Sequence, residues 1–132
     1  DSVYLYWQLS SDNGSSYLTS GYSRMIYYID NQGSGGSAGG DENKPGFYLN
    51  GSSALGNAGR EALNSEITFF GLRSSTTNKS TFHTTIFNKT NAYPQAELGG
   101  FHYSSATVMN NLKLLPNSGN LSTGTVKFYG VK

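Results

Sequence analysis

The sequence contains no cysteine, which excludes a disulfide framework and a thiolate metal site. Only 13% of its 132 residues are charged, the formal net charge is +1, and the nine Lys and Arg are scattered rather than clustered. Because nucleic-acid binding normally requires a concentrated basic surface, we expect no nucleic-acid partner. No apolar run approaches the roughly 20 residues of a membrane-spanning helix, so we expect no membrane insertion.

Strong helix formers are also scarce, and Ser, Thr, Asn and Gly supply most of the polar residues. Aromatic residues reach 14%, which is too many for a disordered chain and suits pleated strands. The length allows one domain with one core, so we expect a single all-β domain over residues 1–132. The chain begins at Asp1 in a strand-like run, without an initiator Met or signal peptide, and we interpret it as the C-terminal part of a longer chain.

Apolar and polar residues alternate along several short segments. Residues 3–9 alternate with Trp7 on the apolar face, so we expect Trp7 in the core, and Asp12-Asn13-Gly14 predicts a hairpin turn after this strand. Further strand patterns lie at 22–29, 47–50, 66–73, 81–87, 107–115 and 125–131. Seven to nine short strands with turns between them favour an antiparallel β-sandwich of jelly-roll type over a parallel sheet.

Three segments depart from simple alternation. Residues 22–29 are aromatic on both faces, which is typical of a strand buried on both sides or covered by a partner. Residues 30–46 hold six of the 17 glycines and are predicted to form a long flexible loop. Residues 54–63 are ambiguous and allow a short helical turn near 60–63.

Both ends of the chain carry motifs of a known group. Ser118-Gly119-Asn120 and then Ser122-Thr-Gly-Thr-Val-Lys-Phe-Tyr-Gly-Val-Lys132 resemble the C-terminal signature of bacteriophage tail and fibre proteins. Leu9-Ser-Ser-Asp-Asn-Gly-Ser-Ser-Tyr17 with Ser20-Gly21-Tyr22 resembles a hairpin of the same group. That group usually has one or more strands before this hairpin, whereas this chain starts almost at it. The middle of the chain carries no resemblance.

The resemblance implies a domain of a virion appendage, located on the virion surface, that binds a host-surface glycan or protein receptor without covalent chemistry. It also implies a homotrimer, which the two-faced segment 22–29 favours independently. Two other functions remain open. One is a purely structural trimerising tip or capsid-decoration domain, and the other is an accessory domain of a glycan-degrading tailspike.

Nothing in the sequence indicates catalysis, so we expect neither an enzyme nor a cofactor. A glycosidase needs two carboxylates across a cleft, and sequence distance alone leaves a pair such as Glu61 and Glu97 possible without supporting it. The two histidines, His83 and His102, occur without a Gly-x-Ser-x-Gly elbow and fit no standard zinc ligand set. We expect both to be surface-facing residues of strands.

Two sets of residues are candidates for ligand contact. Asp30, Asp41 and Glu42 flank the glycine-rich segment with the oxygen ligands that Ca²⁺ takes, but their spacing is not an EF-hand and we expect no bound metal. Tyr93 lies in turn-like sequence next to Pro94, and His102 and Tyr103 follow Gly99-Gly100, so all three are expected near loop ends, where binding surfaces gather. Tyrosine rings offer rigid amphipathic contact area, so we predict that these three residues bind the receptor.

Overall fold

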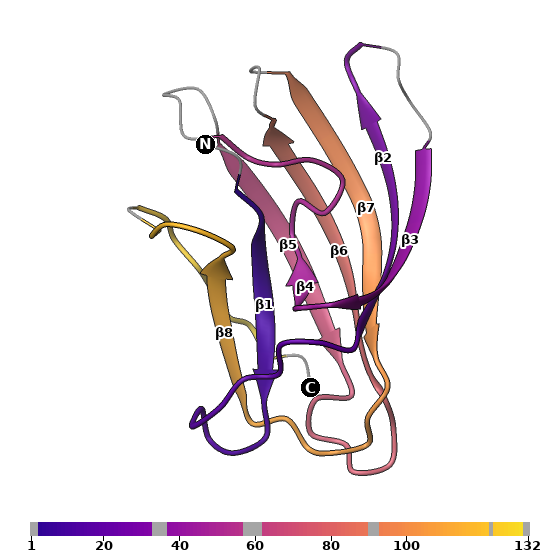
Figure 1. Cartoon of the computed structure of the whole chain (residues 1–132), viewed down its shortest axis with the longest axis vertical. Helices are drawn as coiled ribbons and strands as arrows, with labels where there is room; N and C mark the ends of the chain where they lie inside the picture. Colours follow the sequence, from indigo (N-terminus) through magenta and orange to yellow (C-terminus); the bar gives the residue numbers. More distant parts are fainter. Residues whose placement is uncertain (1–2, 33–36, 57–61, 90–92, 122, 131–132) are drawn as a thin grey trace.

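The structure is a computed structural model and describes residues 3–32, 37–56, 62–89, 93–121 and 123–130. These residues form eight strands and no helix (Figure 1). The strands are β1 (Leu5–Ser10), β2 (Tyr22–Asp30), β3 (Ser37–Lys44), β4 (Phe47–Tyr48), β5 (Leu63–Phe70), β6 (Lys79–Asn88), β7 (Pro94–Tyr103) and β8 (Asn111–Pro116). Among these residues, no helix is long and apolar enough to cross a membrane. The predicted all-β class is confirmed.

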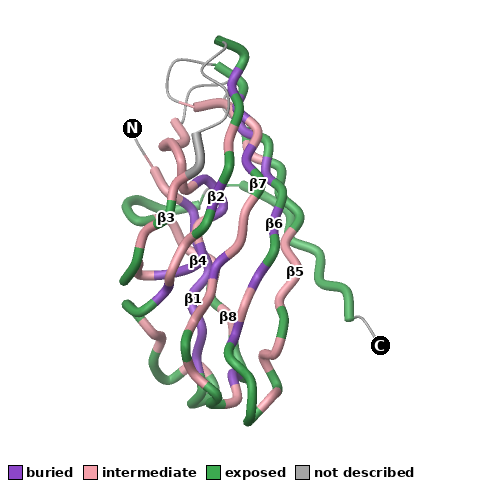
Figure 2. The backbone as a smooth tube through the Cα atoms, turned by 90° about the vertical axis from the view of Figure 1, so that its right-hand side faces the viewer, coloured by how far each residue is buried: buried purple, intermediate pink, exposed green. Residues whose placement is uncertain are grey.

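Two antiparallel sheets pack against each other. One has three strands in the order β4-β1-β8, and the other has five in the order β3-β2-β7-β6-β5. Figures 1 and 2 show the smaller sheet lying against one side of the larger one. The prediction of antiparallel rather than parallel pairing is therefore confirmed, since every strand pair runs antiparallel.

The core lies between the sheets and is rich in aromatic rings. Tyr22 packs edge-on against Phe47 at 4.8 Å between ring centroids, and Phe47 lies 5.5 Å from Phe101. Trp7 is 5% exposed, which confirms its predicted place in the core. The core cluster comprises Leu5, Trp7, Leu9, Tyr22, Phe47, Leu49, Phe101 and Met109. Burying each large apolar side chain stabilises the fold by about 1.5–3 kcal/mol.

The expected hairpin after β1 is wrong, although its turn forms. Asn13 and Gly14 adopt left-handed φ angles of 60° and 86°, as a tight reversal requires. However, β1 pairs with β4 and β8, while β2 belongs to the other sheet. The turn residues fix a local reversal but not the pairing partner, and residues 11–21 are numerous enough to carry the chain across to the second sheet.

The predicted loop 30–46 is also wrong, because its second half forms strand β3. Gly39 and Gly40 pair with Ile26 and Met25 along the outer edge of β2. Backbone hydrogen bonds to β2 hold this strand, so it forms without the alternation of apolar and polar side chains that marks other strands in the sequence. Residues 33–36 lie outside the described residues.

Strand β7 contains Gly99 and Gly100 at its middle, and apart from the strand position expected for His102 it was not predicted from the sequence. A Cβ atom added at Gly99 would lie 2.5 Å from the Met25 carbonyl oxygen, so glycine is required for the close approach of β2 and β7. Gly-Gly therefore marks close strand packing here rather than a loop.

The C-terminal segment is not a strand. Residues 123–130 pair with no described strand and are exposed, which contradicts the expected strand at 125–131. Phe128 nevertheless reaches back to Trp7, with ring centroids 5.7 Å apart. A strand needs a partner edge, which the alternation of residue types does not supply. Of the ambiguous segment 54–63, residues 57–61 lie outside the described part, and Leu63 begins β5.

Candidate functional site

Strand β6 buries its polar side and exposes its apolar side. Thr81, His83 and Thr85 face the core at 6% exposure or less, whereas Phe82 and Ile86 on the opposite side are 50% and 55% exposed. Figure 2 shows the same alternation of buried and exposed residues along this strand. This arrangement reverses the usual one, in which the more apolar side of a strand faces the core.

The apolar side of β6 continues across the neighbouring strands. We name the outward-facing side chains of β2, β7, β6 and β5 the outer face. The strand register aligns them in rows, namely Met25-Gly100-Phe82-Thr68, Tyr27-Leu98-Thr84-Glu66 and Ile29-Ala96-Ile86-Asn64. Glu66, on the edge strand β5, is the one charged residue in these rows.

The large apolar side chains of the outer face are all about half exposed. They are Met25, Tyr27, Ile29, Phe70, Phe82, Ile86 and Leu98, with exposed fractions between 45% and 64%. Single exposed apolar residues are ordinary on protein surfaces, but a contiguous set on one sheet face marks an interaction site.

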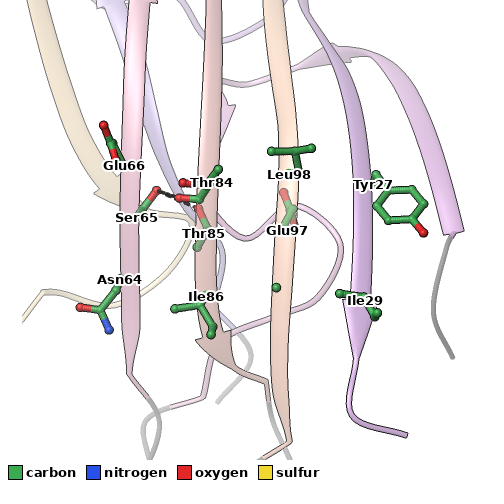
Figure 3. A pocket seen from close by; sticks show the side chains of 11 residues that line it. Tyr27, Ile29, Asn64, Ser65, Glu66, Thr84, Thr85, Ile86, Glu97 and Leu98 are labelled. Carbon is green, nitrogen blue, oxygen red and sulfur yellow. Dashed lines mark hydrogen bonds between the residues drawn. The ribbon is translucent and has the colours of Figure 1, made fainter. Parts of the chain in front are cut away.

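A shallow recess of about 680 Å³ lies on the outer face (Figure 3). Ala96 is too small to fill the space between the larger residues of β2 and β6. Tyr27 and Ile29 from β2, Ile86 from β6 and Leu98 from β7 line its apolar part, and Asn64, Glu66 and Thr84 line its polar part. The recess can therefore accept a protruding side chain or part of a flat ligand.

Directly behind the recess, Glu97 points into the core and anchors a polar cluster. Its Oε1 lies 3.2 Å from His83 Nε2 and accepts a hydrogen bond from the Gly51 backbone N–H at 3.2 Å. Its Oε2 accepts hydrogen bonds from the Ser52 backbone N–H at 3.0 Å and from the Ser52 hydroxyl at 2.5 Å. Gln95 in turn donates to the Ser52 hydroxyl. The cluster thus ties β6 and β7 to the segment that follows β4.

Two opposing effects set the pKa of Glu97. Burial raises it, but the hydrogen bonds from His83 and Ser52 together outweigh burial and lower the pKa below the usual value of a glutamate. Glu97 is therefore an ionised carboxylate at neutral pH.

The side chains at the centre of the Glu97 cluster are enclosed in the core. The side chains of His83 and Glu97 are both fully enclosed, so a substrate cannot contact them. Ser52 donates to Glu97 rather than to His83, so the order of a Ser-His-acid triad is absent here. The expectation that His83 faces the surface is wrong. Its ring faces Phe101 in the core at 6.1 Å. Glu61, which was considered as a partner of Glu97, lies outside the described residues.

The three predicted receptor residues do not form one site. Tyr93 is exposed just before β7, whereas His102 and Tyr103 lie at the far end of this strand, about 30 Å away at 3.3 Å per residue. His102 occupies an outward position, while Tyr103 faces inward and packs on Tyr22 at 5.0 Å. Their role in binding stays a prediction.

The predicted calcium ligands are also apart. Asp30 ends β2 and pairs with Lys89 at 2.9 Å. Asp41 pairs with Arg24 near the start of β2 and with Lys44 at 3.3 Å. A hydrogen bond from Lys44 and the charge of Arg24 lower the pKa of Asp41. Glu42 is exposed on β3. Within the described ranges, no three His, Asp or Glu residues are grouped to hold a metal ion.

Sequence reasoning did not identify the outer face, although part of its signal was visible. The two-faced segment 22–29 pointed to a covered strand, but the contributions of β6 and β7 appear only once the register is known. Comparisons with protein-family models, with curated proteins and with solved structures found no match to this chain. The chemistry of the outer face therefore carries the functional argument.

Proposed function

We propose that this chain is a non-catalytic domain of a virion appendage, a β-sandwich of jelly-roll type on the virion surface, that works by contact of its outer face with a protein partner. The resemblance of its two ends to phage tail and fibre proteins supplies the setting. The outer face supplies the mode of action, since seven large apolar side chains lie half exposed on one sheet face with one charged residue in its rows.

A protein partner suits the outer face better than a receptor glycan does. Sugars require many hydrogen bonds to their hydroxyls, whereas most of this face offers methyl groups and aromatic rings. Protein interfaces have such apolar centres with a polar rim, and Asn64, Glu66 and Thr68 on the edge strand β5 form a rim of this kind. Among the functions considered from the sequence, this favours the purely structural tip or capsid-decoration domain, whose protein partner belongs to the virion itself.

The two methionines of the chain provide a direct test. Met25 lies on the outer face at 64% exposure, whereas Met109 lies in the core at 4%. Mild peroxide oxidises exposed methionine to the sulfoxide, and mass spectrometry reads both sites in one sample. We expect Met25 to be oxidised rapidly in the dilute isolated chain and to be protected in the intact appendage, with Met109 protected in both. Equal reactivity of Met25 in the two samples would contradict the proposal.

Receptor-glycan binding is the second candidate, and the recess favours it. Tyr27 offers a ring 48% exposed, and Asn64, Glu66 and Thr84 offer hydrogen-bonding groups nearby. A glycan array with the chain and its Tyr27→Ala variant tests this site, and binding that Tyr27→Ala abolishes would support it. Tyr93→Ala and Tyr103→Ala, made separately and together, test the loop-end residues in host-cell adsorption. Unchanged adsorption by a folded double variant would remove these two residues from the receptor site.

A further inference from the structure

We infer that the partner covering the outer face is another copy of this chain, so that the domain self-associates sheet to sheet. This inference rests on the proposed function, because it names the partner of the same surface. Three properties of the face carry it: its area, its charge and its relief.

The exposed apolar area of the face matches what a stable association needs. Half the surface of a Phe or Tyr side chain is about 100 Å², and Met, Ile and Leu side chains are smaller, so the seven half-exposed side chains present on the order of 600 Å². The largest apolar patch on a typical monomer is about 300–600 Å², and a standard interface buries about 800 Å² on each partner. The face therefore lies at the upper end of the range for an ordinary monomer and approaches the size of one half of an interface.

The charge distribution allows two identical faces to meet. The chain carries a formal net charge of +1, so two copies repel each other only weakly. Within the rows of the outer face, Glu66 lies on the edge strand β5 beside Thr84 of β6, and the positions contributed by β2, β7 and β6 carry no charge. A surface recognising a charged partner would instead present a set of complementary charges. An uncharged apolar centre is complementary to itself.

The relief of the face provides both projections and depressions. Gly100 separates Met25 from Phe82, and Ala96 separates Ile29 from Ile86, so large side chains alternate with small ones across the strands in these two rows. Side chains of two stacked sheets interdigitate in this way at a separation of about 10 Å. A projecting Phe82 or Ile86 of one copy can thus enter the depression on another.

The experiment measures the molar mass of the purified chain by sedimentation over a wide concentration range. We expect a dimer or trimer, and either supports the inference. Ile86→Asp and Phe82→Asp each place a carboxylate in the covered centre and should weaken association by about 100-fold or more. Leu121→Asp is the matched control, since Leu121 is 52% exposed but lies outside the outer face, and its association should equal that of the unchanged chain.

Folding of each variant is checked through the fluorescence of Trp7, the one tryptophan of the chain and a core residue. A folded chain that stays monomeric at millimolar concentration overturns the inference, as does association that both aspartate variants leave unchanged.

Oxidation of Met25 separates this inference from the proposed function. If Met25 is protected in the intact appendage while the isolated chain is monomeric, another protein covers the face, so the inference fails and the proposed function survives. If Met25 is equally reactive in both samples, both fail.

Discussion

Glu97 and Leu98 are adjacent on β7 and serve opposite sides of the same sheet. The Glu97 carboxylate is enclosed in the core, where it joins His83 and Ser52, while Leu98 is 45% exposed on the outer face. The polar cluster therefore lies directly behind the apolar surface. Fixing strands β6 and β7 from behind holds the outer face in shape, because both strands contribute residues to it.

The lowered pKa of Glu97 predicts that the fold loses stability in acid. Its pKa in the folded chain is lowered, so its stabilising contribution is fully present above the ordinary pKa of a glutamate and is lost as the pH falls through the lowered pKa. We expect Glu97→Gln to cost about 1–3 kcal/mol of unfolding free energy at neutral pH and to flatten the loss of stability in acid. Urea unfolding between neutral pH and about pH 3 measures both. Glu66→Gln, at an exposed position, is the control, and equal acid slopes for Glu97→Gln and the unchanged chain would contradict the prediction.

The contact between Phe128 and Trp7 predicts a spectroscopic change. Because Trp7 is the one tryptophan, its emission reports directly on the ring that Phe128 approaches edge-on. We expect Phe128→Ala to shift this emission and, since Phe128 is 70% exposed, to cost only about 0.5–1 kcal/mol. Tyr129→Ala, at 81% exposure, should leave the spectrum unchanged. Identical spectra for the two variants would show that the C-terminal segment does not hold this contact in solution.

The close approach of β2 and β7 at Gly99 predicts that one added methyl group there destabilises the fold. An alanine Cβ there would lie 2.5 Å from the Met25 carbonyl oxygen, so β2 and β7 would have to separate. We expect Gly99→Ala to lower the unfolding free energy by about 1–3 kcal/mol in urea denaturation. Gly39→Ala is the matched control, because its added Cβ meets its nearest neighbour at an ordinary 3.8 Å. Equal midpoints for both variants would rule out this packing.

The buried hydrogen bonds of Lys79 predict that its ammonium group stabilises the loop before β6. Its side chain is fully buried, and Nζ donates to the carbonyl oxygens of Ser74 at 2.8 Å and Thr77 at 2.7 Å. Lys79→Met keeps an unbranched apolar side chain but leaves both carbonyl groups without this donor, so we expect a loss of about 2 kcal/mol or more. Exposed Lys127→Met should change stability by less than about 0.5 kcal/mol. Thermal melts of the two variants decide, and coincident melts would contradict the role of Lys79.

Short-range features of the fold could be predicted from the sequence. Composition indicated an all-β domain, and alternation located most of β1, β2, β4, β5, β6 and β8, with shifts of a few residues at their ends. The Asn13-Gly14 turn also forms as expected. These features follow from backbone preference and local spacing, which a single segment expresses by itself.

Strands without side-chain alternation escaped prediction. Strand β3 is rich in glycine, and β7 begins at Pro94 and contains Gly99-Gly100, so neither carries the pattern of a strand. Both form because β2 offers hydrogen-bonding edges to them. Conversely, residues 123–130 carry a strand pattern but pair with no described strand.

Which side of β6 faces the core was likewise determined by the tertiary structure. Alternation in β6 separates Phe82 and Ile86 from His83 and Thr85 but does not say which set faces the core. Glu97 favours the inward position of His83, because its carboxylate pairs with the buried ring and is itself held by Ser52. By itself, the sequence therefore determined which segments favour strands and where the turns between them fall. Only the tertiary structure decided which strands pair and which side remains open, since both depend on contacts between residues far apart in the chain.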